Sequence, residues 1–142
     1  MVAPPLRLLD RINSAGDIND PGTPRPLLTL EEFFEGNSDH GSIGYNFYPD
    51  QPTPEEFYEL FRTIRSRPSV ADVRVEVAQH DDRESWPTTD TIWVVTSSTE
   101  AELRAWLGDR FAPDEVLTDF AKREAEPLPI PPGMVAFGVW WD

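Results

Sequence analysis

The chain has 142 residues, with 26 acidic side chains against 12 Lys and Arg, and a formal charge of -14 at pH 7. This length suits one domain, and the charge argues against nucleic acid or anionic lipid as a direct partner, because such binding relies on cationic side chains. The absence of cysteine excludes disulfides, thiol nucleophiles and cysteine-ligated metals. No signal-peptide core or long apolar run is present, so we expect a soluble cytoplasmic protein that does not bind membranes.

The first 27 residues are rich in proline and polar residues and show no sustained apolar period. They predict an N-terminal arm that is ordered only if it packs on the domain, which is expected over residues 28–142. Thr29 and Glu32 have the spacing of a capping box, which predicts a short helix over residues 30–35. Alternating apolar residues then predict a strand over 42–48.

The strongest helix signal follows at Thr53. This threonine is a good N-cap, Pro54 suits the first helical position, and Glu56 completes a second capping box. An apolar stripe at helical spacing continues to Pro68, which ends the predicted helix; its members are Phe57, Leu60, Phe61 and Ile64.

The second half of the chain predicts strands and a further helix. Residues 73–77 alternate in the manner of an edge strand, whereas residues 91–96 are continuously apolar or β-branched, as in a central strand. A third capping box at Thr99 and Glu102 opens a helix that ends near Gly108. Residues 113–122 predict a short helix, and residues 134–141 form the last predicted strand.

Without the small helices, these elements follow the order β-α-β-β-α-β. This order predicts an α+β, ferredoxin-like fold in which a four-stranded antiparallel sheet carries two helices on one face. On the other face, alternation places the aromatic side chains of Tyr48, Trp93 and Trp140. Three explanations for this apolar patch stay open: cover by the N-terminal arm or by residues 107–122, a homodimer, or a groove for a partner or ligand.

An acidic run occupies the first half of the domain. From Pro26 to Phe61 the chain has eight acidic residues and no Lys or Arg. Such a field can steer a basic partner, although the same charges can also serve as a solvated face. The first candidates for partner contacts are Glu31, Glu32, Glu35, Asp39 and Asp50.

The chain offers little for catalysis or for a cofactor. His80 lies near several carboxylates, but these groups follow no metal-ligand spacing and indicate a polar turn. There is no nucleophile elbow, phosphate loop or dinucleotide fingerprint. We therefore expect no catalytic residues, no metal and no cofactor.

Residues 28–46 (LTLEEFFEGNSDHGSIGYN) and the closing VWWD resemble small acidic bacterial proteins of uncharacterised function. In overall character the chain also resembles the immunity proteins that neutralise polymorphic toxins. That resemblance implies a small α+β protein that blocks a toxin's active site by surface complementarity. It assigns no functional residues.

These observations favour a non-enzymatic protein-interaction module of the immunity or inhibitor kind, which binds a basic protein through its acidic surface. The alternative is a dimeric α+β barrel in which two sheets pack face to face around a small-molecule site. Tyr48, Trp93 and Trp140 would then lie at the interface, and carboxylates would supply any acid-base group.

Overall fold

The helices begin where the sequence supplies reciprocal caps. The computed structural model describes residues 3–44, 46–47 and 51–142, in which α2 (Leu30–Phe34), α3 (Pro54–Arg65) and α4 (Glu100–Leu107) all start after a threonine. In each, the threonine hydroxyl accepts a hydrogen bond from the backbone N–H three residues later, and the glutamate there accepts one from the threonine N–H. All three predicted capping boxes are confirmed.

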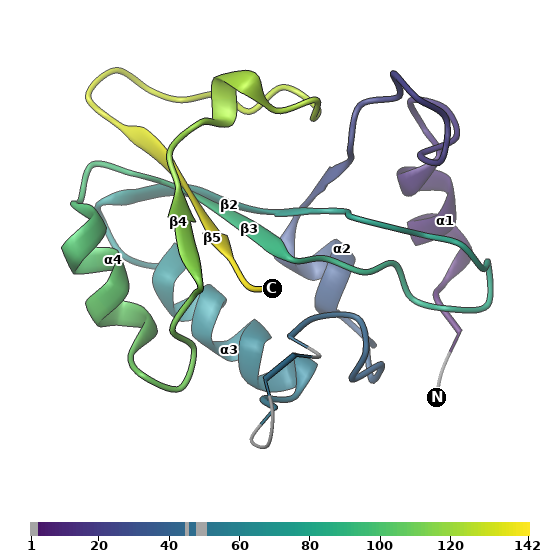
Figure 1. Cartoon of the computed structure of the whole chain (residues 1–142), viewed down its shortest axis with the longest axis horizontal. Helices are drawn as coiled ribbons and strands as arrows, with labels where there is room; N and C mark the ends of the chain where they lie inside the picture. Colours follow the sequence, from purple (N-terminus) through teal and green to yellow (C-terminus); the bar gives the residue numbers. More distant parts are fainter. Residues whose placement is uncertain (1–2, 45, 48–50) are drawn as a thin grey trace.

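The sheet has five antiparallel strands in the order β1-β2-β3-β5-β4 (Figure 1). Their bounds are Leu27–Leu28 for β1, Val70–Glu76 for β2, Thr91–Thr96 for β3, Glu115–Leu117 for β4 and Val135–Trp140 for β5. The α+β class and the predicted strands at β2, β3 and β5 are confirmed. The four-stranded ferredoxin-like arrangement is not. β2 lies between β1 and β3, but β1 pairs only with Val75 and Glu76, so the predicted edge character holds for the earlier part of β2.

The strand predicted over 42–48 is wrong for the described part of that segment. Ile43 forms only an isolated bridge with Thr89, and Gly44 adopts φ +67°. The backbone then turns, so that the N–H of Phe47 donates to the carbonyl of Gly44 at 3.0 Å. A side chain at Gly44 would place its Cβ 2.8 Å from the Phe57 ring, so close packing requires glycine here. Tyr48 lies outside the described residues.

The short helix predicted over 113–122 is also corrected. Val116 pairs with Val139, which makes residues 115–117 the edge strand β4, and only the 3₁₀ turn η1 (Phe120–Lys122) is helical. The N-terminal segment contains α1 (Leu6–Ile12), a helix that the sequence analysis did not predict. Leu8 and Ile12 belong to the main core, so this segment packs on the domain.

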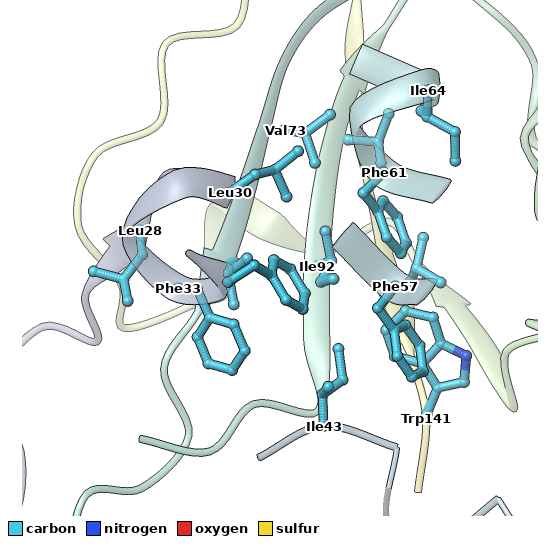
Figure 2. Packing of buried hydrophobic residues seen from close by; sticks show 14 of the residues in the cluster. Leu28, Leu30, Phe33, Ile43, Phe57, Phe61, Ile64, Val73, Ile92 and Trp141 are labelled. Atoms are coloured by element: carbon cyan, nitrogen blue, oxygen red, sulfur yellow. The ribbon is translucent and has the colours of Figure 1, made fainter. Parts of the chain in front are cut away.

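The main core fills the space between the sheet and the helices. Phe57, Phe61 and Ile64 of α3 and Phe33 of α2 belong to one core with Ile92 of the central strand (Figure 2). Trp141 closes one end of this core, with its ring edge-on to Phe57 and Phe61 at centroid distances of 5.4 and 5.9 Å. Within the described residues, every helix is too short or too polar to cross a lipid bilayer.

The second face of the sheet is covered by the chain itself. Residues 118–134, here called the covering segment, cross the face opposite α2, α3 and α4 (Figure 1). Trp93 is fully buried there, edge-on to Phe120 at a centroid distance of 4.9 Å. A Cβ at Gly138 would lie 2.9 Å from the Trp93 ring, so glycine makes room for it. The prediction that Trp93 lies on an open face is therefore wrong, because the covering segment buries it. Trp140 lies on the same face by alternation and is half-buried.

Two ion pairs attach the covering segment to the rest of the protein. The buried Glu76 carboxylate accepts hydrogen bonds from Arg123 Nη2 at 2.6 Å and from Trp93 Nε1 at 3.0 Å. The Glu126 carboxylate accepts from Arg11 Nη2 at 2.7 Å and from the backbone N–H of Leu27 at 2.8 Å. The two ion pairs thus join the covering segment to α1 and β2, and the hydrogen bond from Leu27 joins it to β1.

We predict that Arg123→Met destabilises the protein by about 3–5 kcal/mol, because it leaves the buried carboxylate of Glu76 without its cation. Adding Glu76→Gln in the same chain removes that uncompensated charge and recovers part of the loss. Urea unfolding of the wild type and both variants, followed by tryptophan fluorescence, measures the free energies of unfolding. A double variant no more stable than Arg123→Met would contradict this explanation.

Candidate functional site

Most of the chain's cations are used inside the chain. Seven of the twelve basic side chains form ion pairs among the described residues. The excess of acidic side chains is therefore left with few free cations to offset it. The pairs are Arg11 with Glu32 and Glu126, Arg62 with Glu59, Arg65 with Glu31, Arg74 with Asp72, Arg104 with Glu100, Arg110 with Glu56, and Arg123 with Glu76.

Of the predicted partner-binding residues, Glu31 joins α2 to α3. Both its carboxylate oxygens accept hydrogen bonds from Arg65, at 2.8 and 2.6 Å, and the Tyr58 hydroxyl lies 3.5 Å away. The hydrogen bond from Arg65 lowers the pKa of Glu31 from its ordinary value of 4.5 to about 2. Glu31 is thus committed to an internal pair, which reduces its availability to a partner.

The other predicted residues differ in their surroundings. Glu32 caps α2 and lies 3.4 Å from Arg11, so it also has an internal role. Glu35 is exposed just after α2, and Asp39 is half-buried and accepts a hydrogen bond from the N–H of Gly41 at 2.9 Å. Asp50 lies outside the described residues. Glu35 and Asp39 are therefore the members of this set that the described structure leaves most accessible.

A groove lies on the other flank of α3, against the loop that follows α4. Its volume is about 510 Å³, and its lining is largely apolar. Leu60 and Phe111 form the apolar part, and three glutamates from the first half of α3 stand beside them. The complete lining is Glu55, Glu56, Glu59, Leu60, Thr63, Arg110 and Phe111.

The loop side of this groove is firmly attached to the core. The carbonyl of Phe111 accepts a hydrogen bond from Trp141 Nε1 at 3.1 Å, and its ring packs edge-on against Phe57 at 5.2 Å. Three residues further, the N–H of Asp114 donates to the carbonyl of Trp140 at 2.9 Å. These contacts fix the Phe111 side of the groove.

One carboxylate of the groove is held from both sides. Glu56 Oε1 accepts the N–H of Thr53 at 3.1 Å as part of the capping box, and Oε2 accepts from Arg110 Nη2 at 2.8 Å. The hydrogen bond from the Thr53 backbone, aided by the charge of Arg110, lowers the pKa of Glu56. The side chains of Arg110 and Glu56 are 49% and 43% exposed, so this pair is open to water.

The groove was missed by the sequence analysis, although its glutamates were noted. Leu60 was assigned to the buried stripe of α3, but it is half-buried and faces the groove. Phe111, an aromatic residue in a polar loop, was the one available signal. At the polar turn near His80, as in the rest of the described residues, no group of three or more potential ligands is arranged to hold a metal ion.

We predict that Glu31→Gln lowers stability at pH 7 by up to about 1 kcal/mol, since the Glu31–Arg65 pair is partly exposed and screened by solvent. Because folding lowers the pKa of Glu31 to about 2, its contribution is complete above pH 4.5 and fades as the pH falls toward 2. Urea unfolding from pH 7 to pH 2 should therefore show the two curves converging in that range. Glu84→Gln, which neutralises a carboxylate in an exposed loop, is the control. If the difference in the free energy of unfolding between the wild type and Glu31→Gln does not change with pH, the pairing is refuted.

Comparison with known proteins agrees with the bacterial character suggested by the sequence. A relative from Escherichia coli (strain K12), described as "Uncharacterized protein YfbO", is 39% identical over 142 residues, which cover 99% of this chain and 100% of the relative. No solved structure is significantly similar to the chain. The model of the Uncharacterized protein YfbO family matches residues 4–139, and the chain belongs to this family.

Proposed function

We propose that this chain is a non-enzymatic interaction protein that binds a basic protein partner through an acidic surface. The acidic surface consists of the exposed carboxylates of α2, α3 and the segment between them. The proposal rests above all on how the arginines are distributed: four that lie next to this surface, at positions 11, 62, 65 and 110, are each paired with one of its glutamates. The remaining acidic side chains are left to attract a cationic partner.

Three acidic side chains of this surface are suited to contact a partner. Within the described residues, Glu35, Asp39 and Glu55 form no ion pair, and Glu35 and Glu55 are exposed. A field of one sign raises the rate of encounter with an oppositely charged protein, and carboxylates buried in the complex add specificity. The resemblance to immunity proteins implies that such a protein blocks a toxin's active site by surface complementarity, so we include an inhibitory role in the proposal.

The alternative, a dimeric barrel with a small-molecule site, finds less support. Such a dimer needs the second face of the sheet for its partner. In this chain the covering segment occupies that face and buries Trp93 beneath Phe120. A barrel would require residues 118–134 to leave the sheet and break the pair between Glu76 and Arg123.

The test is to capture partners from host-cell lysate on the immobilised protein, identify them by mass spectrometry and titrate the purified partner by calorimetry at two salt concentrations. We expect a partner with a basic surface, with weaker binding at high salt and in a variant that combines Glu35→Gln with Asp39→Asn. Loss of two such contacts should reduce affinity at least tenfold if they are buried in the complex.

The matched control combines Asp81→Asn with Glu84→Gln, which makes the same change of net charge on the exposed loop between β2 and β3. It should retain most of the affinity. Equal losses of affinity in the two double variants would show that only the net charge of the protein matters. An affinity that changes neither with salt nor in either double variant would contradict the proposal.

A further inference from the structure

The groove beside α3 combines two properties that rarely occur together on an acidic surface. Its largely apolar lining includes Leu60 and Phe111, while Glu55, Glu56 and Glu59 supply negative charge beside them. A carboxylate cluster alone would suit any cation. An apolar floor next to carboxylates instead suits a side chain with a long aliphatic stem and a cationic head, which is the chemistry of arginine and lysine.

Arginine fits this arrangement better than lysine. The planar guanidinium group can donate two parallel hydrogen bonds to one carboxylate, and it packs against aromatic rings such as that of Phe111. The chain shows both kinds of contact on the flank of α3 that faces away from the groove: Arg65 binds Glu31 through two nitrogens, and the guanidinium of Arg62 lies 4.3 Å from the centre of the Tyr58 ring.

Arg110 occupies part of the groove in the free protein. It donates to Glu56 Oε2 at 2.8 Å, and both side chains remain about half exposed. Exposed pairs of this kind contribute little to stability, so an external guanidinium can replace Arg110 at small cost. Phe111 next to it is held by Trp141 and Phe57. A guanidinium from outside can therefore replace that of Arg110 without moving the Phe111 side of the groove.

We propose that the groove between α3 and residues 108–112 is the docking site for an arginine-bearing segment of the basic partner, and that Arg110 is an internal competitor for that site. This inference rests on the proposed function, which it extends by naming the site and the partner's side chain. It adds a site on the opposite flank of α3 to the contacts proposed above at Glu35 and Asp39. The occupant is argued from charge complementarity and from the apolar lining.

Removing the competitor should strengthen binding. Arg110→Ala frees the second oxygen of Glu56, and we expect it to raise affinity for an arginine peptide by about two- to fivefold, in the range of exposed ion pairs. Arg83→Ala is the matched control, because it removes the same charge from an exposed loop. The control separates the effect of removing Arg110 from the groove from the effect of the more negative net charge.

Removing the receiving charges should weaken binding. Glu59→Gln and Glu55→Gln are the suitable variants, because Glu56 also caps α3 and its loss would disturb the helix. Glu55→Gln is the cleaner of the two, since Glu59 also pairs with Arg62. Each should reduce peptide affinity by about two- to fivefold relative to Glu84→Gln, the control of equal charge. Leu60→Ser, which removes apolar floor without changing charge, should also weaken binding.

The experiment titrates the ¹⁵N-labelled protein with the acetylated, amidated peptide GRLRG and follows backbone amide shifts by NMR. We expect the shifts to concentrate at Leu60, Thr63, Arg110 and Phe111, with Arg110→Ala tighter than Arg83→Ala. Shifts spread over all acidic residues, shifts centred on α2, or equal affinities for the two arginine variants would overturn the docking site.

These outcomes are distinguishable from failure of the proposed function. Shifts centred on α2 would leave an acidic surface that binds basic partners, but would place the site elsewhere. The partner capture described above tests the function without reference to the groove. If a basic partner is found and its affinity does not respond to Glu59→Gln or Arg110→Ala, the groove proposal is refuted and the function stands.

Discussion

The buried carboxylate of Glu76 determines how the chain covers the second face of its sheet. A charged group at this depth needs a cation, and the chain supplies Arg123, 47 residues later. Closing this pair brings Phe120 onto Trp93 and carries the proline-rich covering segment across the strands. One electrostatic requirement thus makes a sheet with helices on one side into a three-layer structure, and leaves α2 and α3 as the acidic surface.

The parts of the fold that sequence predicts are those that depend on neighbours in the chain. Thr29, Thr53 and Thr99 each find their glutamate three residues away, so the starts of α2, α3 and α4 could be read directly. The alternation of β2 and the β-branched run of β3 were equally visible. The segment at 42–48 had the same alternation, but Gly44 turns the backbone where it meets Phe57, and that contact is tertiary.

The candidate site was less predictable for the same reason. The sequence indicated an acidic surface, because charge can be counted, but it did not indicate which carboxylates are already engaged. Arg65 reaches Glu31 across 34 positions, and Arg110 reaches Glu56 across 54. Only the folded chain brings Phe111 beside Leu60, so a groove with an apolar floor has no signature in local spacing.

The lengths of the outer strands have a consequence for behaviour at high concentration. β1 has two residues and β4 has three, and these are the two edges of the sheet. A short edge offers few unpaired backbone groups to a strand from another molecule, which is the usual route to edge-to-edge aggregation. Among the longer strands, β3 is paired along both sides, whereas β1 covers only Val75 and Glu76 of β2, and β4 covers only residues 138–140 of β5. Along the part of β2 that β1 leaves uncovered, the ion pair between Asp72 and Arg74 places charged side chains that oppose pairing with a strand of another molecule.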